Sequence, residues 1–387
     1  MGRVVVLTPP TQNRSRLLRQ ARDRSGLDHT AFARRLGALI GRPQLGPGAI
    51  RLWEDDTSNS PPPAEVIEAA SFLAIEAPRT SRPPIESIDA ESQPSELIAH
   101  LTAATRVDDA LIDRLQAHTH SFRHIDRQLG TNAVSVDLAA HLDRMNDLWT
   151  YRTAGRARER LATAVSEAAA LAGWQALDQQ QLEAAWTMHE LAKRAAAEGG
   201  DRCAQAFATA QQALVLLDVG RVPDAVQLVS SAKRHLRRLP PRLVSWLHSA
   251  DAEVLAAAGQ PNQARRALTA ADARMPHTPL EPDLPYVVLD QVHLARWRGS
   301  ALAHLGDESA IDDLSSAVAL MDSTFTRAGA GLHSDLALAL ARSGEIDQAK
   351  EHIELAGDLA NAVGSDRQRR RISERATLIR SLRLPMR

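Results

Sequence analysis

Apolar positions recur at steps of three and four residues along most of the chain, and this spacing is typical of amphipathic helices. One run places Val107, Leu111 and Leu115 on a single face, and Phe122 and Ile125 follow it. No run alternates between apolar and polar residues in the way that indicates a strand. The pattern therefore predicts an all-α fold.

The second half of the chain repeats one pattern: a glycine, a short polar turn, and an alanine inside the next apolar run. The glycines are spaced 39, 47 and 38 residues apart. A glycine readily ends a helix in the left-handed conformation, and a small alanine lets the next helix pack closely. A repeat of this length predicts a solenoid of helix pairs over residues 153–384. The pairs are Gly220 and Ala225, Gly259 and Ala264, Gly306 and Ala310, and Gly344 and Ala349, with a weaker unit at Ala185.

Residues 14–77 predict a separate domain of four short helices, preceded by a loose tail over residues 1–13. Asp28 is placed to cap the second helix. Ile50 and Trp53 lie three apart on the third helix and are expected to face the core. Pro63 suits the first turn of a fourth helix, which would bury Val66, Ala70 and Leu73.

Between the two halves, residues 77–97 contain four prolines together with many serine and glutamate residues. Prolines interrupt helices, and few of these side chains can enter a core. We therefore expect a linker over residues 78–105 and a helical connector over residues 106–152.

Three stretches carry a resemblance to known families. The N-terminal unit resembles the Cro/repressor-like helix-turn-helix of the XRE family in its run LLRQARDRSGLDHTAFARRLG, then AIRLWE, then the prolines. The repeats resemble tetratricopeptide repeats, most closely in ARSGEIDQAKEHIELAGDLANAVGS. With the block FRHIDRQLGTNAVSVDLAAHLDRMNDLW between them, the chain resembles actinobacterial regulators that join these two domains.

This resemblance implies a cytoplasmic transcriptional regulator whose third helix enters the major groove of operator DNA. Arg51 would read a guanine edge, and His29 and Thr30 would lie at phosphates. Residues 1–53 hold ten arginines against two aspartates, an excess of eight positive charges that suits phosphates. The residues expected at DNA are His29, Thr30, Arg34, Arg35, Gln44, Gly48, Ala49 and Arg51.

The resemblance also implies that the repeats bind an effector, with a peptide as the first expectation and a protein or small molecule as alternatives, and that they form a homodimer. Trp246 and Glu253 lie seven apart on one helical face, and Gln212 and Arg296 lie on neighbouring first helices. We expect these four residues at the effector. The alternative for Trp246 is simple packing between repeats.

A different interpretation is a protein-interaction scaffold whose helix-turn-helix no longer binds DNA. Two features favour it. The segment between Ala33 and Ile50 is about seven residues longer than is usual in the family, which needs an extended second helix or a longer turn. Asp55 and Asp56 place negative charge near the expected phosphates.

Other chemistry is not indicated. The chain of 387 residues has a net charge of −1, one cysteine (Cys203) and no apolar run long enough to span a membrane. It has no phosphate-binding loop and no nucleophile elbow, and His118, His120 and His124 lack further ligands for a metal. We therefore expect no enzymatic activity, no cofactor and no metal.

Overall fold

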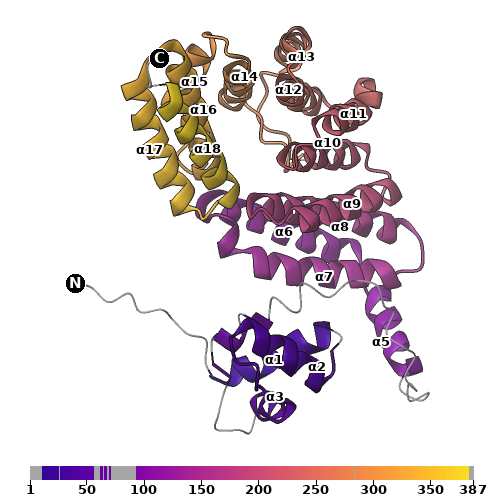
Figure 1. Ribbon diagram of the computed structural model, residues 1–387. Coiled ribbons are helices and arrows are strands. Elements are labelled where there is room, and N and C mark those ends of the chain that lie inside the picture. Colours follow the sequence, from indigo (N-terminus) through magenta and orange to yellow (C-terminus); the bar gives the residue numbers. More distant parts are fainter. Residues whose placement is uncertain are drawn as a thin grey trace. The chain divides into compact units, whose positions relative to one another are not determined.

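The computed structural model describes residues 11–25, 27–55, 62–63, 65–67, 69–70, 93–282 and 284–382. These residues form helices, turns and connections and contain no strand, so the prediction of an all-α fold is confirmed. The chain divides into two compact units between residues 90 and 91 (Figure 1). Of the predicted tail, residues 11–13 belong to the first helix, and the rest lies outside the described residues.

The N-terminal unit contains α1 (Thr11–Ser25), α2 (His29–Leu39) and α3 (Pro47–Glu54), and residues 65–67 and 69–70 are also helical. Asp28 caps α2, since its side chain accepts a hydrogen bond of 2.7 Å from the backbone N of Ala31. Ile50 is fully buried in the core, against which Trp53 packs with its side chain partly exposed. The predicted cap and core positions are confirmed, except that Leu73 lies outside the described residues. The rest of this core consists of Leu18, Ala21, Phe32, Ala33, Leu36, Val66 and Ala70.

The second unit is built mainly from pairs of helices. Its elements are α5 (Gln93–Thr105), α6 (Asp109–Leu129), η1 (Thr131–Ala133), α7 (Ser135–Tyr151), α8 (Arg156–Asp178), α9 (Leu182–Glu198), α10 (Arg202–Asp218), α11 (Val222–Ala232), η2 (Lys233–Arg238), α12 (Pro241–Ala257), α13 (Pro261–Arg274), α14 (Gln291–Leu305), α15 (Ala310–Leu320), α16 (Thr326–Ser343), α17 (Ile346–Ala362) and α18 (Asp366–Leu382).

The repeat pattern has the structural consequence that the sequence predicted. Gly220, Gly259, Gly306 and Gly344 have φ angles of 75°, 65°, 73° and 95°, so each ends its helix in the left-handed region. The alanine that follows each glycine is fully buried, as is Ala185 in the weaker unit. That weaker unit has Gln180 at φ 58° in place of a glycine.

The predicted linker is wrong for residues 93–105, because they form α5. This helix packs against α7 and belongs to the second unit. Arg152 donates hydrogen bonds of 2.8 and 2.9 Å to the carbonyl oxygens of Ala104 and Thr105 and so holds its end. Pro94 is only the second residue of the helix, where a missing N–H costs no internal hydrogen bond. The predicted connector, residues 106–152, packs on α8 and is part of the same unit.

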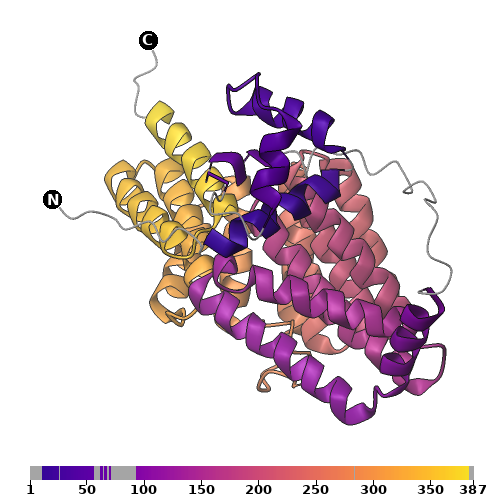
Figure 2. The ribbon, with the colours of Figure 1, turned by 90° about the horizontal axis from the view of Figure 1, so that it is seen from below.

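The last helices of the second unit return to its beginning. The yellow C-terminal helices lie beside the magenta helices α6 and α8 in both views (Figures 1 and 2), and α16 contacts α6 while α18 contacts α8. Gly130 permits this approach: a Cβ atom built there would lie 2.0 Å from the carbonyl oxygen of Val363. The helices of this unit therefore enclose a central space.

Candidate functional site

The second unit contains a cavity of about 250 Å³. Its walls are α6, α8, α10, α12, α14, α16 and α18, together with the connection before α14. These are the first helices of successive pairs, joined by α6 from the predicted connector and by the last helix. Closure of the unit therefore converts an inner face into a pocket.

Aromatic side chains form one part of the wall. Phe207 lies at the centre, with ring centroids 4.6 Å from Trp246 and 4.7 Å from Tyr286. Trp297 meets Trp246 edge-on at 6.2 Å. Trp174 and Phe325 also line the cavity. Such a wall provides flat apolar surface for a ligand.

Charged side chains form another part of the wall. Six arginines line the cavity: Arg123, Arg127, Arg296, Arg327, Arg367 and Arg371. Four carboxylates face them: Asp126, Glu167, Glu253 and Asp335. The lining thus holds more positive than negative groups, and where these groups are buried their electrostatic interactions are stronger than in water.

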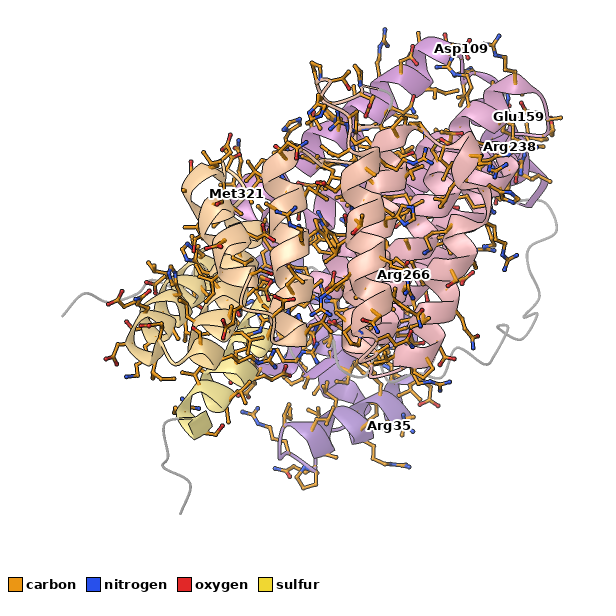
Figure 3. The ribbon with its side chains drawn as sticks, turned by 90° about the horizontal axis from the view of Figure 1, so that it is seen from above. Arg35, Asp109, Glu159, Arg238, Arg266 and Met321 are labelled. Carbon is orange, nitrogen blue, oxygen red and sulfur yellow. The ribbon has the colours of Figure 1, made fainter. Side chains whose placement is uncertain are left out.

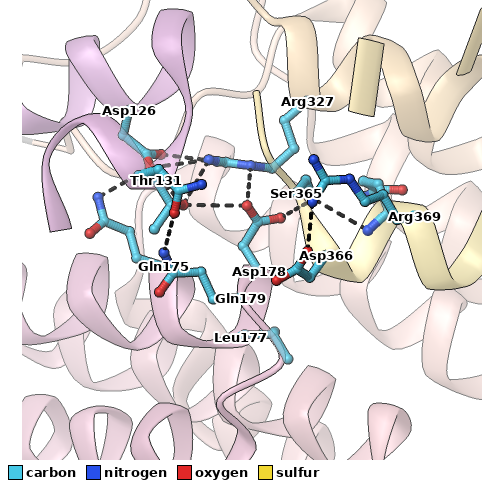
Figure 4. A network of polar contacts seen from close by, with 12 residues as sticks. Asp126, Thr131, Gln175, Leu177, Asp178, Gln179, Arg327, Ser365, Asp366 and Arg369 are labelled. Atoms are coloured by element: carbon cyan, nitrogen blue, oxygen red, sulfur yellow. Dashed lines mark hydrogen bonds and ion pairs between the residues drawn. The ribbon is translucent and has the colours of Figure 1, made fainter. Parts of the chain in front are cut away.

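Most of these arginines have carboxylate partners in the protein. Arg327 of α16 binds Asp126 of α6 through contacts of 2.9 and 3.1 Å and Asp178 of α8 at 2.9 Å (Figure 4). Thr131 accepts a further bond of 3.0 Å from Arg327. Ser365, which precedes α18, donates to Asp178 at 2.5 Å. We call these five residues the closing network, because they join α6, η1 and α8 to α16 and the start of α18.

A second buried contact supports the closure. Arg367 of α18 holds Asp218 of α10 through two contacts of 2.9 Å, and both side chains are 6% exposed. Gln180 donates to the same carboxylate at 3.0 Å. Further along α18, Arg375 pairs with Asp335; burial acts to raise the pKa of Asp335, but Arg375 and Arg371 lower it to about 2.

Arg296 differs from the four arginines of the wall that pair with carboxylates, which are Arg123, Arg327, Arg367 and Arg371. It forms no ion pair with any carboxylate of the described residues, and its buried Nε has no hydrogen-bond partner among them. Its guanidinium lies 5.3 Å from the ring centroid of Trp297. Burial lowers the pKa of Arg296, and Glu253 and Asp335 act in the opposite direction without bonding to it. The cavity therefore presents two arginines without an ion pair among the described residues, Arg127 and Arg296, and Arg296 is the one that lies beside the aromatic cluster.

Other buried polar atoms of the wall also lack partners among the described residues. They are Nη1 of Arg123, Oε1 of Gln211, the hydroxyl of Tyr286, Nε2 of His293 and Oε1 of Gln368. Buried polar groups are normally hydrogen-bonded in folded proteins, so unpartnered groups around one cavity suit a polar ligand.

Three of the four residues predicted at the effector lie in this cavity: Trp246, Glu253 and Arg296. Trp246 is 6% exposed, so it packs between helices as well as lining the cavity. Gln212 does not line the cavity, because it is fully buried on another face of α10 and donates to Glu190 at 2.8 Å. Its neighbour Gln211, turned by about 100° on the helix, lines the cavity instead.

Sequence reasoning missed the wall residues of α6 and α18. A run of arginines such as that of α18 is typical of a solvated outer face, yet Arg367 is 5% exposed and Arg375 is 7% exposed. The sequence did carry a signal that these arginines are buried. They follow a helix rich in apolar residues, and they share a helical face with Ile372 and Ile379.

In the N-terminal unit, most of the residues expected at DNA are exposed. Thr30, Arg34 and Arg35 of α2 are exposed (Arg35 is labelled in Figure 3). Gln44, Gly48 and Arg51 are also exposed, and Ala49 is half-buried. Arg51 follows the fully buried Ile50, so the two side chains point in different directions around α3.

The connection between α2 and α3 spans residues 40–46, so of the two alternatives for the long segment before Ile50 the structure has the longer turn. Gly37 makes it possible: a Cβ atom there would lie 2.5 Å from the carbonyl oxygen of Arg42. The backbone N of Arg42 in turn donates to the carbonyl oxygen of Gly37 at 2.7 Å.

Glu54, at the end of α3, is a residue whose role the sequence did not reveal. It is 6% exposed and accepts from Arg22 of α1 at 2.7 Å. Nε2 of His29 lies 3.0 Å from its other carboxylate oxygen. His29, expected at a phosphate, is therefore engaged within the unit, and Glu54 ties the three helices together.

No protein-family model matches the chain, and no curated protein shows significant similarity to it. Within the described residues, no helix has the length and apolar character needed to cross a membrane.

Proposed function

We propose that this protein is a DNA-binding transcriptional regulator that takes an effector into the cavity of its second unit. The proposal joins a basic N-terminal unit, which resembles the Cro/repressor-like helix-turn-helix, to a unit of helix pairs that resembles tetratricopeptide repeats. The same resemblance supports a homodimer on a two-fold symmetric operator.

The observation that carries the proposal is the charge on α2 and α3. Arg34, Arg35 and Arg51 are exposed and form no ion pair with the described residues. Nearby acidic groups are already engaged: Glu54 binds Arg22 and His29 inside the unit. Unpaired arginines on neighbouring helices attract phosphates and suit base edges.

The effector would act through the closed second unit. A ligand that binds better to one arrangement of these helices than to another shifts their equilibrium by that difference in affinity. A shift of this kind changes the placement of two N-terminal units in a dimer, and half-site spacing makes operator binding sensitive to that placement.

The experiment is a mobility-shift titration of the full chain on the DNA upstream of its own gene, at several salt concentrations. We expect a complex that weakens as salt rises. Arg51→Ala should weaken specific binding by about 1–3 kcal/mol through loss of a base contact. Arg16→Ala is the matched control, since Arg16 is an exposed arginine of α1, and it should change affinity much less.

The second candidate function is a protein-interaction scaffold. It is favoured by the seven-residue connection over residues 40–46 and by the exposed Asp55 directly after α3. Absence of a salt-dependent complex with every genomic fragment supports the scaffold. Equal operator affinity of Arg51→Ala and wild type removes Arg51 as a base reader.

A further inference from the structure

We propose that the cavity binds a compact aromatic molecule that carries a carboxylate or phosphate group, rather than an extended peptide. This inference rests on the proposed effector role of the second unit, and it names the chemical class of the effector. It follows from the volume of the cavity, the composition of its wall and the state of Arg296.

The volume limits the ligand. Pockets for small molecules are typically about 300–1,000 Å³, and this cavity of about 250 Å³ lies just below that range. The closing network joins α16 to α6 and α8, so the inner face does not form an open groove of the kind that an extended chain needs. A molecule of one or two rings fits this space.

The aromatic part of the wall favours a ligand with a flat ring system. Phe207, Trp246, Tyr286 and Trp297 form a continuous aromatic cluster with centroid distances between 4.6 and 6.2 Å. Planar rings gain contact area and favourable edge-to-face geometry against such a cluster.

Arg296 favours a ligand with a negative charge. A buried cation is unfavourable unless it is paired, and Arg296, whose Nε is buried, has no ion pair within the described part of the chain. Its position over Trp297 places the guanidinium beside the aromatic cluster. A carboxylate or phosphate can accept two parallel hydrogen bonds from a guanidinium, which a neutral group cannot match.

His293 adds a polar contact. It is 5% exposed, and its Nδ1 lies 2.9 Å from Oδ1 of Asp290, the residue that caps α14. In the neutral ring, the Nδ1 proton bonds to this carboxylate and Nε2 is an acceptor. Nε2 is buried at the cavity without a partner among the described residues. An N–H or O–H on the ligand body would satisfy it.

The test is calorimetric titration of the purified full chain with three probes and no DNA. Indole-3-acetate carries the ring, the N–H and the carboxylate; indole-3-acetamide has the same shape without charge; inorganic phosphate has charge without a ring. We expect the acetate to bind at least about tenfold more tightly than the amide, the advantage of a charge-assisted contact, and phosphate alone to bind far more weakly than the acetate.

Variants of the chain test whether Arg296 causes the preference for the acetate. Arg296→Gln should remove the preference for the acetate, and Arg296→Lys should keep part of it, since an ammonium retains the charge without the planar fork. Arg266→Gln is the control, because Arg266 is an exposed arginine on the outer helix α13 (Figure 3). Far-UV circular dichroism checks that each variant is folded.

Three outcomes overturn the proposal: equal affinity for acetate and amide, an acetate affinity unchanged in folded Arg296→Gln, or no binding of the acetate at millimolar concentration. Because no DNA is present, these outcomes concern the cavity alone. Failure of operator binding, with the acetate still bound through Arg296, would contradict the proposed regulator and leave the ligand class intact.

Discussion

The closing network makes a specific prediction about stability. Arg327→Met removes the cation that lies between Asp126 and Asp178, whose exposed fractions are 4% and 1%. Both carboxylates then remain buried without their arginine partner. Breaking a buried ion pair by removing one partner costs about 3–5 kcal/mol. We expect the free energy of unfolding of the second unit to fall by that amount.

The pH dependence provides a second readout. Burial raises the pKa of Asp178, and Arg327 acts against that rise. Without Arg327, the pKa of Asp178 should rise further. A carboxyl group with a higher pKa in the folded than in the unfolded chain stabilises the fold at low pH, and this contribution is lost as pH rises through the folded pKa. The free energy of unfolding that Arg327→Met loses relative to the wild type should therefore be larger at about pH 7.5 than at about pH 5.

The assay is urea unfolding followed by tryptophan fluorescence. Five of the six tryptophans lie in residues 91–387, so the signal reports mainly on the second unit. Arg369→Met is the control, because Arg369 pairs with Asp366 at 2.8 Å on the surface, with side chains 45% and 55% exposed (Figure 4). Such pairs contribute about 0–1 kcal/mol.

Adding Asp178→Asn to Arg327→Met should recover part of the lost stability, since one buried charge disappears. The reasoning is refuted if Arg327→Met lowers the free energy of unfolding no more than Arg369→Met does. It is also refuted if the loss caused by Arg327→Met is the same at both pH values.

Three further changes test other contacts. Glu54→Ala leaves Arg22 without its buried carboxylate and should destabilise the N-terminal unit by about 1–3 kcal/mol; an unchanged melting transition of that unit would contradict the role of Glu54. Gly130→Ala places a Cβ atom against the backbone of Val363 and should cost about 1–3 kcal/mol in urea unfolding of the second unit; wild-type stability would show that the contact is not tight. His189 is fully buried, and burial lowers its pKa to about 3. The folded state therefore keeps this ring neutral and loses stability as pH falls below the unfolded pKa of about 6.5. His189→Leu should lose less stability than wild type between about pH 7 and pH 4, and parallel pH profiles would exclude this effect.

The local pattern of the sequence determined the elements of this protein. Helical periodicity, the cap at Asp28 and the glycine–alanine pairs concern contacts within a few residues, and they were predicted because helix geometry alone fixes which side chains share a face. Trp246, Glu253 and Arg296 could be placed on inner faces for the same reason. Gln212 could not, since a single residue of register moves a side chain by about 100° around its helix.

Only the tertiary structure decided that the second unit closes. The contacts that join Arg327 to Asp126 and Ser365 to Asp178 span 201 and 187 residues of sequence, so no local pattern predicts them. Closure depends on the sum of small rotations between successive helix pairs, and each rotation is set by side-chain packing rather than by periodicity. That sum places α6 and α18 in the wall of the cavity, and it turns arginines that resemble a solvated surface in the sequence into buried partners of aspartates.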